Sequence, residues 1–315
     1  MKKNLTLAIV GAGYMAKEHL KAFNALVDVK LVGIYSRTKV KAEALAKQFQ
    51  IDHVCDSISD LYKKTNADLV VVATPVLETK NVCNELFNYS WISLIEKPVG
   101  YTFEEAAMLA NKAKELNHQA FVALNRRHYS STIALIDDLS QDDQSRVLNI
   151  FDQEDIINAQ KSGQPQAVLN NWMYANAIHI IDYISLFLRG NVVSVENVVR
   201  WNPDNPYHVL SKIGFSSGDL AVYQCFWNAP GPWSVSLTTK RRRWELRPLE
   251  NLAYQDFGQR KAIPVEMAQD DVEFKPGLLR QAKELLKAFR REEHHLPSLS
   301  DALKSMELTK RIYEL

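Results

Sequence analysis

Cysteine is scarce in this sequence, with three residues among 315, Cys55, Cys83 and Cys225. They lie far apart and form no C-x-x-C pair, so neither a disulfide framework nor a cysteine-rich zinc site is indicated. No spacing typical of metal ligands occurs elsewhere, and we expect no bound metal. A reducing cytoplasm is the compartment that fits this cysteine usage best.

Long apolar runs and an excess of one charge are missing as well. The longest later apolar stretch, AIHIIDYISLFL, is too short for a bilayer and contains Asp182. The opening MKKNLTLAIVGAG runs straight from a short apolar segment into a glycine loop, so we do not interpret it as a signal peptide. The 38 Lys and Arg residues nearly balance the 37 Asp and Glu residues, which argues against a nucleic-acid partner. We expect a soluble, cytoplasmic protein that acts on a small molecule.

What is present is a regular alternation of apolar runs and helical segments up to about residue 125. This rhythm is typical of a parallel sheet with crossover helices, and several runs are continuously apolar, as in strands covered on both faces. The predicted strands are LTLAIV, KLVGIY, HVC, ADLVVVA, WISLIE and QAFVALN. The sequence therefore predicts a doubly wound α/β domain over residues 1–125.

Residues 126–315 show a different pattern of predicted helices and strands, and a chain of this length favours two domains. A helix-like stretch, NNWMYANAIHIIDYISLFL, precedes the strand-like runs NVVSVENVVRW, HVLSKIGF, DLAVYQCFW and WSVSLTT. Because no crossover helices separate these runs, we expect them to pair antiparallel in a second sheet. Two periodic helices, GLLRQAKELLKAFRR and SDALKSMELTKRIYEL, close the chain and can pack back on the first domain.

A glycine loop follows the first predicted strand. Gly11, Gly13 and Ala16 form a G-x-G-x-x-A pattern, with Tyr14 and Met15 at the start of the next helix. Gly11 permits a tight turn, Gly13 lets a pyrophosphate approach the backbone, and the helix amino terminus attracts phosphate. The pattern alone also fits an ordinary turn, but its place at the start of an alternating domain favours dinucleotide binding.

The end of the second predicted strand reads YSRTK, where NAD-binding domains usually carry an acid that holds the ribose hydroxyls. Ser36, Arg37 and Thr38 instead offer hydroxyl groups and a cation, which suit the 2′-phosphate of NADP. We predict that NADP(H) is preferred and that NAD(H) is possible. The alternative is a solvated basic turn on an NAD enzyme.

The segment LIEKPVGY ends an apolar strand with Glu96, Lys97 and a proline, which packing alone does not explain. Together with the glycine loop, His19, VALNRRH, HIIDYISLFLRGNV and FKPGLLRQAKELLKAF, it resembles the glucose-fructose oxidoreductase / inositol dehydrogenase family. The resemblance extends over essentially the whole chain. It implies a Rossmann domain followed by a substrate-binding and oligomerisation α/β domain with a large, mostly antiparallel sheet. It also implies a homodimer or homotetramer.

The same resemblance implies roles for residues of the first domain. Lys97 would lie beside the nicotinamide, as a cofactor contact, and would contact the substrate oxygen that exchanges a proton during hydride transfer. Glu96, also a predicted cofactor contact, would orient Lys97 or balance its charge. A solvated cap at the strand end is the alternative for Lys97. The resemblance further implies that Thr74, Pro75, Asn125 and Arg126 contact cofactor or substrate, although a proline at a helix start also has a structural explanation.

In the second domain, Asn176, His179 and Tyr183 are spaced to share one helix face. The resemblance implies that this face meets the substrate, with His179 handling the proton and Tyr183 and Asn176 as contacts. Asp182 belongs to the same motif, as an orienting or substrate-binding group. Many family members carry an aspartate four residues before this histidine, and here Ala175 takes that place.

We therefore predict an NAD(P)-dependent oxidoreductase that moves hydride between nicotinamide and a hydroxyl or keto carbon of a sugar or sugar derivative, including nucleotide-linked ketosugars. Ala175 motivates an alternative, a non-catalytic NAD(P)-binding sensor or regulator of the same fold. The basic run Lys240–Arg243 is predicted to be a hairpin end or, less favoured, a contact to a substrate phosphate or carboxylate.

Overall fold

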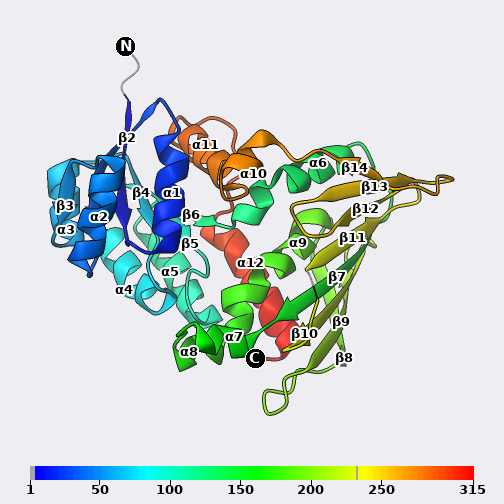
Figure 1. The fold of residues 1–315 in the computed structure, drawn as a ribbon. Coiled ribbons are helices and arrows are strands. Elements are labelled where there is room, and N and C mark those ends of the chain that lie inside the picture. The colour runs from blue at the N-terminus through cyan, green and yellow to red at the C-terminus, as the bar shows by residue number, and fades with distance from the viewer. Residues whose placement is uncertain (1–3, 232) are drawn as a thin grey trace. The chain divides into compact units, whose positions relative to one another are not determined.

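A computed structural model describes residues 4–231 and 233–315, and these form two compact units (Figure 1). Unit 1 runs to Asn125 and includes Glu273–Leu303. Unit 2 consists of Arg126–Val272 and Lys304–Leu315. The segment Glu273–Leu303, which the sequence boundaries put in the second domain, lies in unit 1 because its helix shares the core of that unit.

Unit 1 is built on a six-stranded, all-parallel sheet in the order β3-β2-β1-β4-β5-β6. Its strands are β1 Leu5–Val10, β2 Val29–Tyr35, β3 His53–Cys55, β4 Leu69–Val72, β5 Ile92–Glu96 and β6 Ala120–Ala123. The predicted doubly wound fold is confirmed. The strand order reverses between β1 and β4, and ligands of open α/β sheets bind at such a switch point, outside the carboxyl ends of the strands.

Helices cover both faces of this sheet. One face packs against α1 Tyr14–Asn24, α2 Lys39–Phe49 and α11 Leu278–Phe289. The other helices are α3 Ile58–Thr65, α4 Val76–Leu86 and α5 Phe103–Glu115. Helix α5 begins with a side-chain cap, since Thr102 Oγ1 accepts a hydrogen bond from Glu105 N at 3.3 Å.

Unit 2 contains an eight-stranded sheet in the order β14-β13-β12-β11-β7-β10-β9-β8. Its strands are β7 Val147–Glu154, β8 Val192–Val199, β9 His208–Phe215, β10 Leu220–Trp227, β11 Ser234–Thr238, β12 Arg242–Leu246, β13 Leu252–Asp256 and β14 Ile263–Val265. The pairing is antiparallel as predicted, except that β7 lies parallel to β10 and separates it from β11. Strand β7 is absent from the predicted set.

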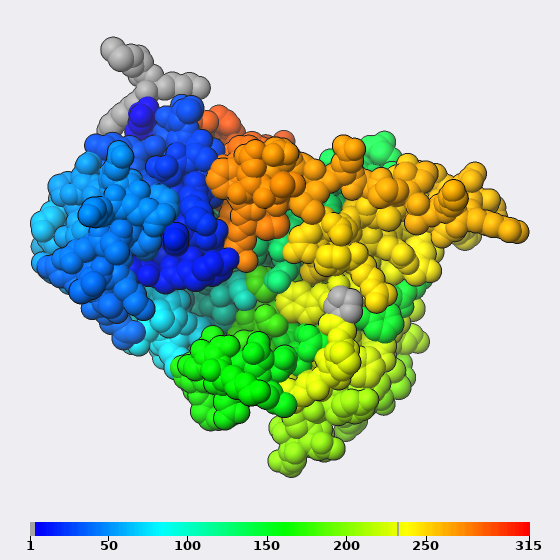
Figure 2. All heavy atoms as spheres, in the orientation of Figure 1, coloured from blue at the N-terminus to red at the C-terminus, as the bar shows by residue number. Residues whose placement is uncertain are grey.

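The inner face of this sheet packs against α6 Ser130–Leu139, α9 Ile178–Phe187 and the end of α12 Leu299–Tyr313. The short elements are η1 Asn125–His128, α7 Ile156–Lys161, α8 Gln166–Leu169, η2 Met173–Ala177 and α10 Gln269–Glu273. The helix predicted from NNWMYANAIHIIDYISLFL is interrupted, because η2 is a single wide π turn before α9. The β13–β14 hairpin projects as a narrow arm (Figure 2), with Phe257 near its tip 87% exposed.

Candidate functional site

The glycine turn of unit 1 lies at the switch point of the sheet. Gly11 follows β1 with φ +117°, a conformation that favours glycine, and its N–H donates to Tyr35 O at 2.8 Å. A Cβ at this position would lie 2.2 Å from Ala73 O, just after β4. Only glycine therefore lets the ends of β1 and β4 approach each other this closely.

Gly13 caps the amino terminus of α1 and is exposed, and an added Cβ there would meet no atom within 4 Å. Tyr14 beside it is 66% exposed, and Met15 is half-buried. Ala16 is fully buried, as close packing of α1 on the sheet requires. The turn thus presents bare backbone N–H groups at a helix terminus, the arrangement that binds a pyrophosphate.

The basic turn after β2 pairs with an acid of α4 that the sequence did not predict. Arg37 Nη1 lies 2.7 Å from Glu78 Oε1 on α4, and the Arg37 side chain is 65% exposed. Ser36 Oγ accepts a hydrogen bond from Thr38 N at 3.3 Å. The guanidinium therefore stands beside the carboxyl end of β2 and is partly neutralised by Glu78.

The end of β5 carries Glu96 and Lys97, both half-buried, followed by the buried Pro98. His19 of α1 is buried, and its Nε2 lies 2.7 Å from Glu96 Oε1. This contact ties α1 to the strand end and fixes the residue that precedes Lys97. Strand β5 pairs with β4, so Lys97 emerges next to the strand that carries Thr74 and Pro75.

The remaining predicted residues of unit 1 lie at two further strand ends. Thr74 Oγ1 lies 3.4 Å from Thr79 Oγ1, and Pro75 caps α4. Asn125 follows β6 and is buried, and its Nδ2 donates to Pro276 O at 3.0 Å. These positions place the predicted cofactor residues after β1, β2, β4, β5 and β6, at one edge of one parallel sheet.

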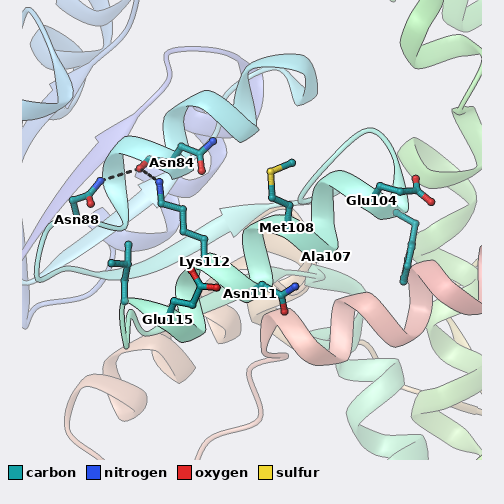
Figure 3. Close-up of a pocket in the computed structure, with 10 residues that line it drawn as sticks. Asn84, Asn88, Glu104, Ala107, Met108, Asn111, Lys112 and Glu115 are labelled. Carbon is teal, nitrogen blue, oxygen red and sulfur yellow. Dashed lines mark hydrogen bonds between the residues drawn. The ribbon is translucent and has the colours of Figure 1, made fainter.

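A separate groove of about 720 Å³ lies between α4 and α5 of unit 1 (Figure 3). Lys112 crosses it and donates to Asn84 O at 2.8 Å. Its lining comes from α4, α5 and the turns after them: Asn84, Asn88, Phe103, Glu104, Ala107, Met108, Asn111, Lys112, Glu115 and Leu116. None of the predicted site residues lines this groove, so we do not assign it to the cofactor.

In unit 2, Arg126 and His179 both face Trp233. The Arg126 guanidinium carbon lies 4.3 Å from the centre of the Trp233 ring, a cation–π contact, and the rings of His179 and Trp233 are 6.3 Å apart. Trp233 Nε1 donates to Gln153 O at 3.0 Å, near the end of β7. The structure thus brings two predicted substrate residues together around one indole.

Asn176 lies on η2, one turn before His179, and is half-buried. Its Nδ2 donates to Glu154 Oε2 at 2.8 Å. Position 175 holds alanine, and the carboxylate beside this turn is instead Glu154 of β7. Asp152 and Glu154 were missed, although two acids at alternate positions in the run VLNIFDQE indicate acids on a buried strand face.

Asp182 and Tyr183 take part in the internal structure of unit 2. Asp182 accepts two hydrogen bonds from Arg127, at 2.6 and 2.7 Å, and one from Ser305 Oγ at 2.6 Å. The Tyr183 hydroxyl lies 2.8 Å from Thr132 Oγ1 and donates to Arg126 O at 3.1 Å, and the side chain is fully buried. The predicted substrate contact is therefore a poor description of Tyr183, because its hydroxyl is already used in holding α9.

The basic run is held by acids of its own unit. Arg241 and Arg242 both pair with Asp138, at 3.0 and 2.7 Å, and Arg242 also reaches Asp256 at 2.6 Å. Arg243 pairs with Glu245 at 2.6 Å. The run lies at the β11–β12 hairpin, which agrees with the hairpin interpretation, and the charges of its three arginines are matched by acids of α6, β12 and β13.

Comparison with known protein families gives a match to the first part of unit 1. Residues 5–124 match the family described as "Oxidoreductase family, NAD-binding Rossmann fold". The match covers the first segment of unit 1 and no residue of unit 2. That description names a nicotinamide dinucleotide, and Gly11 and Gly13 fit such a ligand because they leave the turn of unit 1 open to a phosphate.

The individual proteins that the chain resembles are distant. Glucose-6-phosphate 3-dehydrogenase of Bacillus subtilis is 28% identical over 136 residues, 41% of this chain but only 35% of the relative. The 4-carboxy-2-hydroxymuconate-6-semialdehyde dehydrogenase of Sphingobium is 21% identical and covers 91% of this chain and 90% of its own. The structure of UDP-N-acetylglucosamine 3-dehydrogenase from Acidithiobacillus ferrooxidans has a TM-score of 0.80 at 16% identity, covering 98% and 97% of the two chains.

Within the part of the chain that the structure describes, no group of three or more His, Cys, Asp or Glu residues is placed to hold a metal ion. None of the helices formed by residues 4–231 and 233–315 is both long and apolar enough to cross a membrane.

The two acids of β7 have perturbed protonation. Burial raises the pKa of Asp152 to about 6, against the hydrogen bond that Tyr223 donates to it at 2.6 Å. Burial, and then the charge of Asp152, raise the pKa of Glu154 well above its usual range. Because Tyr223 stabilises the charged form of Asp152, Glu154 is the member of the pair that keeps its proton at neutral pH.

This perturbation predicts a pH-dependent stability. The folded pKa of Asp152, about 6, lies above its ordinary value of 3.8, so the folded state holds more protons between these values and stability falls as pH rises through them. Relative to the wild type, Asp152→Asn should therefore gain about 2–3 kcal/mol of unfolding free energy between about pH 4 and pH 7. Denaturant titrations at a series of pH values measure this.

Asp219 provides the opposite control. Although desolvation opposes ionisation, hydrogen bonds led by Arg189 lower the pKa of Asp219 to about 2. Its stabilising contribution is present above pH 3.8 and is lost as pH falls towards 2. Asp219→Asn should accordingly be less stable than the wild type at neutral pH, and this difference in unfolding free energy should disappear only at acidic pH. A pH-independent difference between Asp152→Asn and the wild type would contradict the raised pKa of Asp152.

Proposed function

We propose that this protein transfers hydride between a nicotinamide dinucleotide, with NADP(H) preferred, and a CH–OH or keto carbon of a sugar or sugar derivative. The observation that carries the proposal is the position of Lys97. It leaves the carboxyl end of β5, beside β4, whose next residues meet Gly11 of the dinucleotide turn. A proton donor thus stands at the same sheet edge as the predicted dinucleotide site.

The bound nicotinamide supplies or accepts the hydride. The residues of this chain do the rest. Gly13 and the amino terminus of α1 hold phosphate, and Lys97 holds and exchanges the proton of the substrate oxygen. His19 and Glu96 fix the strand end from which Lys97 projects. From unit 2, we propose that His179 donates a hydrogen bond to the substrate or relays its proton.

The cofactor preference rests on Arg37. Its exposed guanidinium can form charge-assisted hydrogen bonds to a 2′-phosphate, but in the structure it pairs with Glu78. Arg37→Ala should raise the KM for NADPH about tenfold to a hundredfold and leave that for NADH nearly unchanged. Glu78→Gln should free the guanidinium and strengthen the preference for NADPH. Steady-state kinetics with both cofactors measure these effects.

Lys30 is a matched control for this pair. It lies in β2 away from the carboxyl end and forms a similar surface ion pair, 2.7 Å from Asp52. Lys30→Ala should alter neither KM. An unchanged NADPH KM in Arg37→Ala would contradict the proposed preference.

The substrate class is tested by assaying turnover on a panel of candidate substrates. The names of the relatives suggest glucose 6-phosphate, UDP-N-acetylglucosamine and a carboxylated semialdehyde, and their keto or acid counterparts serve for the reverse direction. Nicotinamide absorbance reports turnover. Failure of every member, with cofactor binding intact, would favour the alternative of a sensor protein.

We also propose a homodimer or homotetramer. The sheet face of unit 2 that turns away from its helices carries Val147 and Phe151 of β7, 40% and 48% exposed. Apolar side chains on an open sheet face are typical of an interface between subunits. Sedimentation equilibrium of the purified protein tests this.

A further inference from the structure

Two acids lie buried on the inner face of β7, and core packing does not account for them. Asp152 and Glu154 are two residues apart and therefore point to the same side of the strand. Asp152 Oδ1 and Glu154 Oε1 accept no hydrogen bond from another described residue, and the proton that Glu154 keeps links the two acids to each other. Burying acids in this way costs stability, which indicates a functional part.

The hydrogen bond between Glu154 and Asn176 determines how the side-chain amide of Asn176 lies. An amide group has donors on its nitrogen and acceptors on its oxygen. The proton that Glu154 keeps is directed at Asp152, so Glu154 Oε2 is left as an acceptor. Because it accepts at 2.8 Å, Nδ2 of Asn176 faces β7 and Oδ1 points elsewhere. Within residues 4–231 and 233–315, Asn176 makes no other side-chain hydrogen bond, and it is only half-buried. Its Oδ1 is therefore available as an acceptor.

We propose that Glu154 is a positioning residue, which locks Asn176 so that Oδ1 accepts a hydrogen bond from a substrate hydroxyl group. The inference rests on the proposed function and adds to it the feature that recognises the substrate. A hydroxyl both donates and accepts. The fixed oxygen of Asn176 and the guanidinium of Arg126 thus offer the complementary acceptor and donors.

The groups around Glu154 explain why an acid is suited to holding the side-chain amide of Asn176 in one orientation. Trp233 joins the same stretch of β7 to Arg126 and His179. The polar and charged groups that face the two acids come from β10, α12, η2 with the turn before it, and η1: Tyr223, Cys225, Tyr313, Trp172, Asn176 and Arg126. In Glu154 the proton is directed at Asp152 and only an acceptor faces Asn176. A glutamine can present either its oxygen or its NH₂ group, and it would allow Asn176 to turn over.

The test is Glu154→Gln, which preserves size and removes the acid. On the panel sugar that the wild type turns over, kcat/KM should fall roughly tenfold to a hundredfold, as expected for a misplaced contact. The preference for that sugar over its analogue lacking the recognised hydroxyl should shrink by a similar factor. The Kd for NADPH should not change. Glu196→Gln, on an exposed acid of β8 in the same sheet, is the matched control and should behave as the wild type.

A second variant guards against misfolding. Asn176→Ala removes the half-buried amide itself, should show the same loss of preference, and should make Glu154→Gln nearly silent in the double variant, because both act on one contact. Additive losses would overturn the inference. So would a Glu154→Gln protein that keeps the full preference for the hydroxyl.

A readout that does not depend on turnover separates this inference from the proposed function. The side-chain NH₂ group of Asn176 should give one pair of ¹H–¹⁵N cross-peaks in the wild type. These cross-peaks should shift or double in Glu154→Gln. Unchanged resonances would overturn the locking role. Shifted resonances in a protein that turns over no panel member would support the locking of Asn176 and overturn the proposed function together with the assignment to a substrate hydroxyl.

Discussion

Lys97→Ala should lower kcat by about a hundredfold or more, because the substrate oxygen loses the group that exchanges its proton during hydride transfer. Lys97 is half-buried at the end of β5, and Glu96 before it is fixed by His19 at 2.7 Å. The Kd for NADPH should change little, since the phosphate-binding turn lies on β1 and α1. Stopped-flow hydride transfer and a fluorescence titration with NADPH measure the two quantities.

Two further variants distinguish proton exchange from charge. Lys97→Arg keeps the cation but holds its proton too tightly to exchange it, so it should remain slow. Lys112→Ala removes a lysine that donates to Asn84 O in the groove between α4 and α5, and it should turn over at the wild-type rate. Near-full turnover in Lys97→Ala would refute the role of this residue.

Much of unit 1 could be predicted because its signals are local. The strands LTLAIV and ADLVVVA are continuously apolar, and the glycine pattern falls between a strand and a helix. These features predicted a parallel, doubly wound sheet, which the structure confirms. The pairing of Arg37 with Glu78 could not be predicted, since it joins the turn after β2 to helix α4, which only the strand order brings together.

Unit 2 was harder because its important contacts are not local. Strand β7 alternates apolar and polar residues and ends in Asp152 and Glu154, so it did not look like a core strand. The parallel pairing with β10 depends on residues more than 70 positions apart. The spacing of Asn176, His179 and Tyr183 indicated one helix face, but the π turn of η2 changes the rotation before α9. Tyr183 consequently lies in the core while Asn176 meets Glu154.

Gly11→Ala should have the second largest effect, on folding as well as on cofactor binding. An alanine Cβ would lie 2.2 Å from Ala73 O, and φ +117° is strained for any residue with a side chain. Strain and overpacking of this kind each cost about 1–3 kcal/mol, so a loss of several kcal/mol in unfolding free energy is expected. The ends of β1 and β4 must then move apart, and NADPH binding should be lost. Thermal unfolding and calorimetric titration measure both.

Gly13→Ala is the matched control, since the two glycines stand two residues apart in the same turn. A Cβ at Gly13 meets no atom within 4 Å, and its φ of −88° suits alanine. Its unfolding free energy should therefore stay near that of the wild type, while the added methyl group obstructs the approach of the pyrophosphate and weakens NADPH binding. If Gly13→Ala bound NADPH as the wild type does, the turn would be a structural one and the dinucleotide would bind elsewhere. If Gly11→Ala were as stable as Gly13→Ala, the close approach of β1 and β4 would be wrong.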